Sequence, residues 1–375
     1  MQREIRAVTP ERVVVGMSGG VDSSVAAALL VEDGIEAIGV TLRVWPWREA
    51  SDPTSRFGSC CSPSTVDDAR RVARRLGMPY YLLNSEREFD RAVIDDFARE
   101  YAAGRTPVPC LGCNRDLKFG SLLRRARAWG ASAVATGHYA RIERDARTGR
   151  VLLLRATDRR KDQTDFLWPL TQDQLAQARF PVGHLTKGEV RDKARAAGLV
   201  TADAPESQEI CFIPDGDYRR FLRRRVPDAF RAGPIVDGSG LRLGEHDGIL
   251  NYTVGQRRGL RIATPRPLYV TRIDAATNTV VVGAAAEVEA VALRAERVNL
   301  ISLSRLDAAM PVTAKIRHGH SPVPAIIGPC ESAEGGLAVE VRFAEPQRAV
   351  TPGQSVVFYD GEVVVGGGVI KGASA

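Results

Sequence analysis

A glycine- and serine-rich segment, GMSGGVDSS (16–24), constrains the fold of this 375-residue chain more than any other stretch. It follows an apolar run, ERVVVGM (11–17), that has the length and composition of a buried strand. It leads into VDSSVAAALLVEDG (21–34), which has the character of a helix. A strand that turns tightly at Gly19 and Gly20 into a helix gathers backbone N–H groups at the helix N-terminus, where they bind anions. The segment therefore predicts a strand–turn–helix unit with a phosphate site.

Strands and helices alternate through the first half of the chain. Apolar runs predict further strands at 35–45, 79–85 and 131–139. Amphipathic periodicity predicts helices at 64–77, 87–104, 114–130 and 184–199. Capping-box spacing occurs at Ser64 and Asp67, and again at Thr186 and Glu189. This alternation favours an α/β fold with a Rossmann-like, doubly wound parallel sheet that is covered by helices on both faces.

The chain changes character near residue 215. Helical periodicity fades, and apolar runs punctuated by glycine, such as PLYVTRIDAATNTVVVG and SVVFYDGEVVVGGGVI, predict short strands. We therefore predict a catalytic domain over 1–214, a small β-rich domain over 215–286 and a C-terminal β-barrel domain over 287–375.

Composition sets the class of protein. Hydrophobic residues make up 44% and charged residues 26% of the chain, which is ordinary for a soluble globular protein. The sequence has no apolar run long enough for a membrane span, and its N-terminus lacks the apolar core of a secretory signal, so a cytoplasmic location is expected. A net charge of +7 suits a polyanionic partner such as a nucleic acid.

The glycine-rich turn differs from the common nucleotide motifs. It fits neither the G-x-x-x-x-G-K-[ST] nor the G-x-G-x-x-G pattern. Instead, S-G-G-x-D-S directly after the first strand resembles the phosphate loop (PP-loop) of the ATP-pyrophosphatase superfamily, whose members cleave ATP between the α and β phosphates and activate a carbonyl oxygen as an adenylate. Asp22 could cap the helix or hold Mg²⁺.

The six cysteines are the second chemical feature of the chain. In a reducing cytosol they do not predict a disulfide scaffold. Cys110 and Cys113 stand in a C-x-x-C arrangement in TPVPCLGCN, and Cys211 lies in ESQEICFI. Free cysteines are often small buried apolar residues, and Cys211 between Ile210 and Phe212 fits that role. Beside an ATP-activating loop, however, two thiols suit sulfur transfer, in which one carries sulfur and the other releases it by forming a disulfide.

Several segments occur in the order found in one family. They are GMSGGVDSS, TPVPCLGCNRDLKFG, ATGHYAR, KDQTDFLWPL, ESQEICFI, YTVGQRRGL and VTPGQSVVFYDGEVVVGGG. Together they resemble the tRNA-specific 2-thiouridylase (MnmA/TrmU) family over almost the whole chain. The resemblance implies ATP-dependent conversion of the wobble uridine of tRNA to 2-thiouridine. It also implies that a sulfur donor protein, a cysteine desulfurase or a sulfur-relay carrier, supplies persulfide sulfur.

The resemblance also implies roles for individual residues. Cys113 matches the nucleophile, and Cys211 matches the persulfide carrier. The implied ATP site is formed by Gly16, Met17, Ser18, Gly19, Gly20, Val21, Asp22, Ser23, Leu42 and Gly137. The implied contacts with the target base or tRNA are Val108, Pro109, Cys110, His138, Lys161, Asp162, Gln163, Arg257, Arg258, Arg317, His318 and Gln354.

The chain departs from the family pattern at two places. Val108-Pro109-Cys110 stands where many members have Asn-Pro-Asp, so the carboxylate often proposed for acid–base work is missing. Either Cys110 carries the proton instead, or that role is less essential than supposed. His318 stands where tyrosine is frequent, which changes the stacking expected there.

Two alternatives remain open from the sequence. Cys110, Cys113 and Cys211 could hold a [4Fe–4S] cluster that handles sulfide, and Cys60 and Cys61, in a long loop expected to be functional, could add ligands. The chain could instead be a different PP-loop adenylating enzyme, for example an amidating one, but no segment suggests the ammonia source that this would need. For Cys330, a plain structural role is expected.

Overall fold

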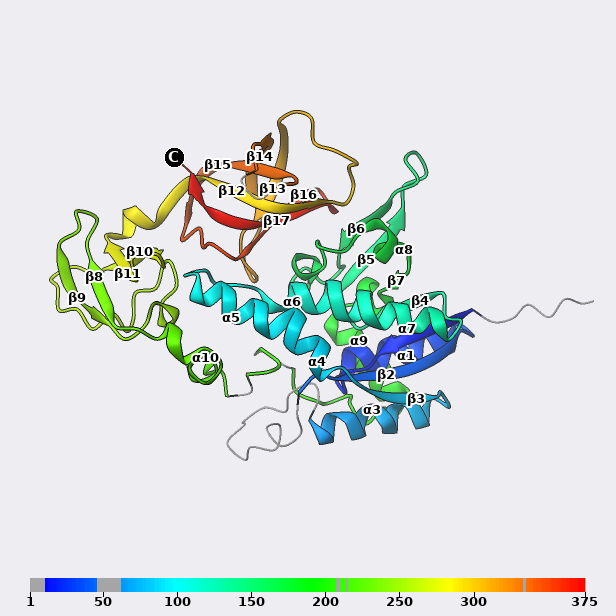
Figure 1. Ribbon diagram of the computed structural model, residues 1–375. Coiled ribbons are helices and arrows are strands. Elements are labelled where there is room, and N and C mark those ends of the chain that lie inside the picture. Colours follow the sequence, from blue (N-terminus) through cyan, green and yellow to red (C-terminus); the bar gives the residue numbers. More distant parts are fainter. Residues whose placement is uncertain (1–10, 46–61, 207–209, 214, 333–334, 375) are drawn as a thin grey trace, which may run out of the picture.

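The computed structural model describes residues 11–45, 62–206, 210–213, 215–332 and 335–374. Cys60, Cys61 and most of the expected loop around them lie outside this part of the chain. Figure 1 shows a parallel sheet with its helices at one end of the molecule, a small sheet at the other end, and a barrel above and between them.

The first sheet confirms the predicted α/β fold. Its strand order is β3-β2-β1-β4-β7, and all neighbours are parallel. The strands are β1 (Arg12–Gly16), β2 (Glu36–Arg43), β3 (Tyr80–Asn84), β4 (Ala133–Thr136) and β7 (Ala178–Arg179). The α-helices of the described residues are α1 (Val21–Glu32), α3 (Pro63–Arg75), α4 (Glu86–Phe89), α5 (Asp95–Ala102), α6 (Pro109–Gly112), α7 (Leu122–Ala128), α8 (Gln172–Ala176), α9 (Lys187–Ala196) and α10 (Tyr218–Arg225).

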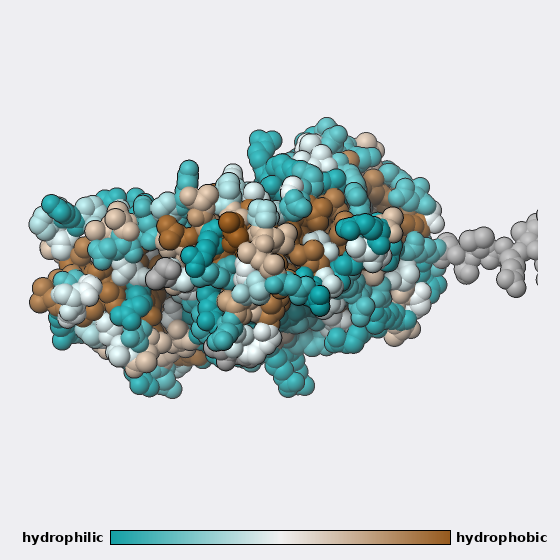
Figure 2. Space-filling view, turned by 90° about the horizontal axis from the view of Figure 1, so that it is seen from above, coloured by the Kyte–Doolittle hydropathy of each residue, from teal (hydrophilic) through white to brown (hydrophobic). Residues whose placement is uncertain are grey.

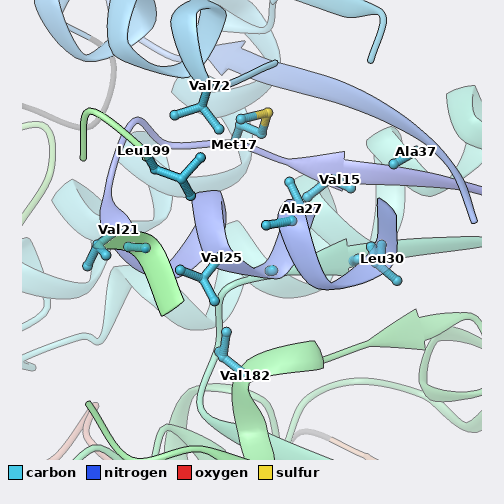
Figure 3. Close-up of a cluster of buried hydrophobic side chains, with 14 of the residues drawn as sticks. Val15, Met17, Val21, Val25, Ala27, Leu30, Ala37, Val72, Val182 and Leu199 are labelled. Carbon is cyan, nitrogen blue, oxygen red and sulfur yellow. The ribbon is translucent and has the colours of Figure 1, made fainter. Parts of the chain in front are cut away.

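Strand β1 is buried on both faces, as a central parallel strand must be. Val13 and Val15 face a cluster that includes residues of α1, α3 and α9, whereas Val14 faces a second cluster that includes residues of α7. Figure 3 shows the first cluster, in which Val25 of α1 packs near Val182. The alternation along β1 therefore produces the helices on both faces that the sequence predicted.

Two helix starts differ from the predictions. Helix α3 is capped by Ser62, whose Oγ accepts a hydrogen bond from Thr65 N (3.3 Å), and not by Ser64. The helix predicted at 114–130 already begins at Pro109, because proline fits the first helical position, where its missing N–H costs nothing. Cys110 and Cys113 therefore lie on the first turn of a helix and not in the loop before it. The capping box of α9, by contrast, is confirmed.

The helix that carries the cysteines changes its pitch at Cys113. It runs from α6 through a π-helical segment, Cys113–Ser121, into α7. A second π-helical segment, Asp90–Ile94, joins α4 to α5. It lies so close to the end of α6 that a Cβ on Gly112 would lie 3.0 Å from Ala92 O. Such wide turns are rare and are frequently found at functional sites.

The remaining strands form a small sheet and a barrel. The small sheet has the order β10-β11-β8-β9, with β8 (Gly233–Val236), β9 (Arg242–His246), β10 (Tyr269–Asp274) and β11 (Thr279–Gly283). The antiparallel barrel has the order β12-β15-β14-β13-β16-β17 and closes through β12 and β17. Its strands are β12 (Glu289–Leu300), β13 (Met310–Lys315), β14 (Val323–Cys330), β15 (Ala338–Arg348), β16 (Ser355–Asp360) and β17 (Val363–Ser374).

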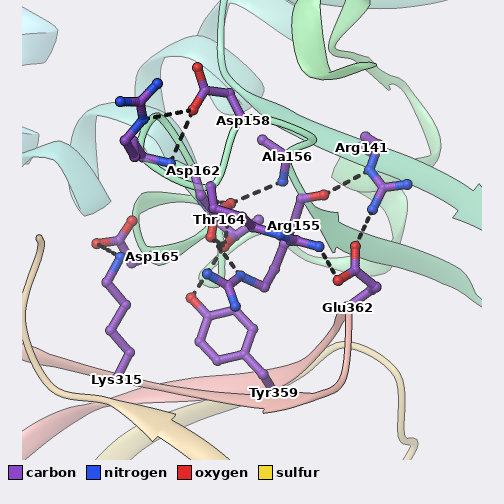
Figure 4. Close-up of polar contacts among 12 residues, drawn as sticks. Arg141, Arg155, Ala156, Asp158, Asp162, Thr164, Asp165, Lys315, Tyr359 and Glu362 are labelled. Carbon is purple, nitrogen blue, oxygen red and sulfur yellow. Dashed lines mark hydrogen bonds and ion pairs between the residues drawn. The ribbon is translucent and has the colours of Figure 1, made fainter. Parts of the chain in front are cut away.

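A hairpin and a polar network attach the barrel to the first domain. The hairpin of β5 (Ala140–Arg144) and β6 (Val151–Arg155) pairs with β17. Figure 4 shows the network, in which Asp162 accepts a hydrogen bond from Arg155 (3.1 Å) and from Thr164, which contacts Tyr359 of the barrel (3.2 Å).

A buried ion pair extends this attachment. Lys315 of β13 lies 3.2 Å from Asp165, and both side chains are buried. Buried hydrogen bonds and an ion pair therefore join the barrel to the first domain.

The surface of the molecule carries both hydrophilic and hydrophobic residues. Figure 2 shows hydrophilic residues over most of the face seen from above, with hydrophobic residues between them. Val291 of β12 and Ile326 of β14 are among the exposed large apolar residues. In the described part of the chain, every helix is too short or too polar to cross a bilayer.

Replacing Asp162 by asparagine tests the interface. Asp162 is buried and Arg155 is partly exposed, so D162N leaves the guanidinium unpaired in a partly solvated place and is expected to lower the free energy of unfolding by about 2 kcal/mol. Urea denaturation followed by circular dichroism measures it. The control D173N, at an exposed carboxylate, should change the value by less than about 0.5 kcal/mol. Equal stability of D162N and D173N would contradict a structural role for the pair.

Candidate active site

The glycine-rich turn between β1 and α1 is held by its own serines. Ser23 Oγ accepts a hydrogen bond from Ser18 N (3.2 Å) and donates one to Gly20 O (3.1 Å). Gly19 has a φ of +77°, and a Cβ there would lie 2.2 Å from Thr65 O of α3. Only glycine fits this position, because the backbone is left-handed and the space is closed. The turn is therefore fixed before any ligand arrives.

The loop after β4 lies directly against the start of α1. A Cβ on Gly137 would lie 2.5 Å from Ser23 N and 2.6 Å from the carbonyl carbon of Asp22. Since β1 and β4 are parallel neighbours, their loops leave the sheet at the same edge. Gly137 thus lies beside the turn that the sequence predicted as the ATP site, as expected for a residue that lines it.

An ammonium group and a phenol bind the carboxylate of Asp22 at the start of α1. Lys187 Nζ lies 2.7 Å and 2.8 Å from the two carboxylate oxygens of Asp22, and Tyr139 donates a hydrogen bond to the same carboxylate (2.7 Å). Burial, together with the neighbouring Asp22, raises the pKa of Tyr139 far above its usual value, so the phenol stays protonated as a donor.

Glu206 extends this group of charges. It accepts a hydrogen bond from Lys161 (2.6 Å) and lies 3.3 Å from Lys187. The hydrogen bond from Lys161, aided by the charge of Lys187, holds the pKa of Glu206 below its usual value. Two lysines therefore lie close to the glycine-rich turn, each paired with a carboxylate that a polyphosphate could replace.

Two of the predicted thiols share one hydrophobic environment. Cys113, at the start of the π-helical segment, and Cys211 both pack against the cluster that contains Phe89, Val93 and Phe212. Leu42, predicted to contact ATP, packs against the same cluster. Cys110 is exposed, whereas Cys113, Cys211 and Cys330 are partly buried.

His138 follows β4 beside the predicted ATP site. Its Nδ1 lies 2.7 Å from Thr136 Oγ1, and its Nε2 lies 3.4 Å from Lys118 Nζ. The ring packs near Phe119 and Phe180. Burial, followed by the charge of Lys118, lowers the pKa of His138 well below its usual value. His138 is therefore a neutral imidazole with an ammonium group at its far nitrogen.

Several predicted tRNA contacts have partners within the protein. Gln163 Oε1 accepts a hydrogen bond from Tyr139 N (3.0 Å), and the side chain of Asp162 is buried in the network described above. His318 Nδ1 lies 2.9 Å from Asp165. Its ring centroid lies 4.8 Å from that of Phe166.

The remaining predicted contacts lie on the small sheet and the barrel. Arg317 donates hydrogen bonds to the carbonyl oxygens of Arg348 and Ala349 (2.7 and 3.0 Å). Gln354 donates one to the carbonyl oxygen of Thr106. Arg257 and Arg258 are exposed.

A cavity of about 170 Å³ lies between the cysteine-bearing helix and the barrel. Val108 and Pro109, two of the predicted target-base residues, line it together with Arg297 and Gly353 of the barrel side. Arg297 has a φ of +50°, an uncommon backbone conformation for a residue with a side chain.

Besides Tyr139, the neighbour of His138 in the chain, three residues of the site are missing from the sequence-based prediction. Lys187 and Glu206 surround the phosphate turn, and Lys118 contacts His138. Only Lys187 carried a local signal, since it directly follows the capping residue Thr186 and so begins a helix that packs on α1.

The geometry of the turn and the sheet first defines the class of protein. A parallel sheet whose first strand leads through S-G-G-x-D-S into a helix N-terminus is the nucleotide-binding arrangement of the PP-loop ATP pyrophosphatases. Three family models match consecutive parts of the chain: "tRNA methyl transferase HUP domain" at 11–215, "tRNA methyl transferase PRC-barrel domain" at 219–284 and "Aminomethyltransferase beta-barrel domain" at 290–370.

Full-length relatives then identify the family. A protein of Heliobacterium modesticaldum named tRNA-specific 2-thiouridylase MnmA is 54% identical over 96% of this chain and 92% of its own length. A relative of the same name from Roseiflexus castenholzii is 51% identical over 96% of this chain and 99% of its own length. Another, from Acetivibrio thermocellus, is 50% identical over 97% of this chain and 100% of its own length. The chain belongs to the tRNA-specific 2-thiouridylase family.

The lowered pKa of His138 has a measurable consequence. A histidine that stays neutral in the folded state but is protonated in the unfolded chain reduces stability as the pH falls through its unfolded pKa, about 6.5. The variant H138Q should therefore lose less stability than the wild type when the pH is lowered through that range. Urea denaturation at each pH provides the comparison, with ¹⁵N NMR of the imidazole as a direct check. A wild-type His138 signal that titrates near its ordinary pKa would contradict the assignment.

Proposed function

We propose that this protein is an ATP-dependent tRNA uridine 2-sulfurtransferase that converts the wobble uridine to 2-thiouridine. The observation that carries the proposal is the identity of 50% or more with full-length 2-thiouridylases. The site supports it, since a preformed phosphate turn and two thiols in one hydrophobic environment supply the two halves of the reaction.

The first half is adenylation. The uracil O2 attacks the α-phosphorus of ATP, a bond forms between them, and pyrophosphate leaves. The N–H groups at the start of α1 and the ammonium groups of Lys187 and Lys161 stabilise the negative charge that develops on the leaving phosphates. Both lysines must then exchange their carboxylate partners for phosphate oxygens.

Mg²⁺ suits this step as the ion that accompanies ATP. Magnesium usually binds proteins through one or two carboxylates and the phosphates of the substrate. Asp22 is the carboxylate of the phosphate turn, and it would hold the ion there.

The second half is sulfur transfer. In one route, the persulfide of Cys211 attacks C2 and AMP leaves. Cys113 then attacks Cys211 Sγ, which forms a Cys113–Cys211 disulfide and leaves sulfur on C2. In the other, Cys113 first cleaves the persulfide, and the released hydrosulfide attacks C2 and expels AMP. Either route oxidises two thiols, so a dithiol reductant must restore them.

An iron–sulfur version of the reaction finds no support in the described residues. Among them, no group of three or more histidine, cysteine or acidic side chains is gathered as a metal would require. We therefore route no step through a cluster. An alternative amidating reaction has no role for the two thiols.

The proposed partners follow from the reaction. The substrate is the anticodon arm of a tRNA, and exposed Arg257 and Arg258 in the small sheet region suit its phosphates. The sulfur of Cys211 comes from a cysteine desulfurase or a sulfur-relay carrier. The division at 1–214, 215–286 and 287–375 belongs to the same proposal. Each part has its own sheet, except that the β5–β6 hairpin of the first part pairs with β17 of the barrel.

Serine variants of the two cysteines test the proposal. C113S and C211S should each reduce 2-thiouridine formation by at least about a thousandfold, because a hydroxyl can neither carry nor release sulfane sulfur. Mass spectrometry of nucleosides from tRNA treated with enzyme, ATP and a persulfide donor measures it, and ATP binding should persist. The control C330S should remain active. Full activity of C113S or C211S would refute the scheme.

Replacing Gly137 by alanine tests the ATP site. The added Cβ displaces Ser23 N, so G137A should weaken ATP binding by about tenfold or more, equivalent to about 1.4 kcal/mol. Isothermal titration calorimetry provides the measurement. The matched control is G188A, whose Cβ would meet only Thr186 Oγ1 at 3.9 Å. Unchanged affinity in G137A would place ATP elsewhere.

A further inference from the structure

A short connector, Gly104–Thr106, leads from the end of α5 to the helix that carries Cys113. We propose that this connector couples the two outer domains to the thiols, with Thr106 as a positioning residue for Cys113. The inference rests on the proposed function in taking sulfur transfer as the step that Cys113 performs. Figure 1 shows the end of α5 beneath the barrel and beside the small sheet, so the connector lies where the three parts of the chain meet.

The barrel binds the main chain of Thr106 on both sides. Thr106 N donates a hydrogen bond to Pro352 O (2.8 Å), and Gln354 Nε2 donates one to Thr106 O (2.8 Å). Gly353 lies between these two partners with a φ of +90°. A Cβ on Gly353 would lie 2.9–3.0 Å from Thr106 N, C and O. The contact between Gly353 and Thr106 is therefore between two backbones, and only the hydrogen bond from Gln354 comes from a side chain.

The small β-rich domain contacts the same connector. Thr106 Oγ1 donates a hydrogen bond to Thr253 Oγ1 (3.2 Å). A Cβ on Gly104 would lie 2.8 Å from Ile273 of β10. Thr253 directly precedes the segment that contains Arg257 and Arg258, the proposed tRNA phosphate contacts. Docking of tRNA on that segment is therefore linked to Thr106 through one side-chain hydrogen bond.

Buried charges hold the middle of the connector. Arg105 donates two hydrogen bonds to the buried carboxylate of Glu100 (2.6 and 2.8 Å), and Arg297 of the barrel lies 4.0 Å from the same carboxylate. Although burial opposes it, these cations lower the pKa of Glu100. The carboxylate thus stays charged, and α5, the connector and the barrel remain joined.

The residues after Thr106 transmit its position. Pro107 and Pro109 have fixed φ angles, and Thr106 and Val108, which precede them, are restricted by the proline rings. Pro109 begins the helix whose first turn carries Cys110 and ends at Cys113. A stiff connection of this kind moves as a unit, so a displacement of Thr106 reaches the thiol. The pair of close contacts at Gly353 and Gly104 is then required for the position of Cys113 and not only for stability.

The experiment uses the full-length protein with G353A as the test and G361A as the matched control. Gly361 also has positive φ (+55°) and lies in the same barrel, but a Cβ there would meet nothing within 4 Å. Both variants place a Cβ on a backbone with positive φ. The strain is greater at Gly353, whose φ of +90° lies further from the region that L residues adopt, and only G353A also pushes on Thr106. T253V provides a second, milder variant that removes one hydrogen bond to Thr106 and keeps the shape of the side chain.

Two quantities are measured for each protein. One is 2-thiouridine formation, separated into kcat and the KM for tRNA. The other is the rate of alkylation of Cys113 by iodoacetamide, followed by mass spectrometry with and without tRNA. We expect G353A to lower kcat about tenfold to a hundredfold, since a displacement of about 1 Å at a reacting group can cost that much, with little change in KM. The alkylation rate of Cys113 should change in G353A and lose part of its response to tRNA in T253V.

The outcomes separate the coupling from the proposed function. Wild-type kcat and wild-type alkylation in both G353A and T253V would overturn the coupling, as would equal losses in G353A and G361A. If G353A does not fold, T253V decides, and an alkylation response to tRNA identical to the wild type refutes the inference. A wild-type protein that binds tRNA but forms no 2-thiouridine would overturn the proposed function instead, and the alkylation comparison would still decide on the coupling.

Discussion

The parallel pairing of β1 with β4 fixes where the chemistry can take place. Parallel neighbours send their loops out at the same edge of a sheet, so the glycine-rich turn after β1 and Gly137 after β4 must meet. They meet this closely because Gly137 lacks a Cβ, which would lie 2.5 Å from Ser23 N. The histidine that follows Gly137 is thereby held beside the phosphate turn. A single feature of strand pairing thus brings together segments more than a hundred residues apart.

The lysines around the glycine-rich turn are paired with carboxylates. Two unpaired lysines in an anion site would repel each other and would attract other anions. Here Lys187 forms an ion pair with Asp22, and Lys161 forms one with Glu206, which also lies near Lys187. Each cation therefore has a partner that it can exchange for phosphate. Such exchange replaces one charge-assisted hydrogen bond by another and costs little, which favours a site that is both stable and responsive.

Much of the fold could be predicted from the sequence, because strand and helix periods, capping boxes and the phosphate motif are local signals. The α/β sheet, the strand-rich second half and the capping of α9 follow from such signals. The sequence predicts the start of the cysteine-bearing helix too late, since a proline such as Pro109 suits a loop as well as the first position of a helix. Lys118, Glu206 and the contacts of Thr106 could not be found, because each depends on a partner distant in the chain.

The closure of the barrel has a consequence for the order of assembly. Strand β12 completes its pairing only with β17, and β17 also receives the hairpin of β5 and β6. During synthesis, domains nearer the N-terminus fold first, so the parallel sheet and its phosphate turn are complete while β17 is still missing. The barrel residues that bind Thr106 can take their places only after this strand arrives. A nascent chain can therefore complete its glycine-rich turn before the barrel is able to hold Thr106.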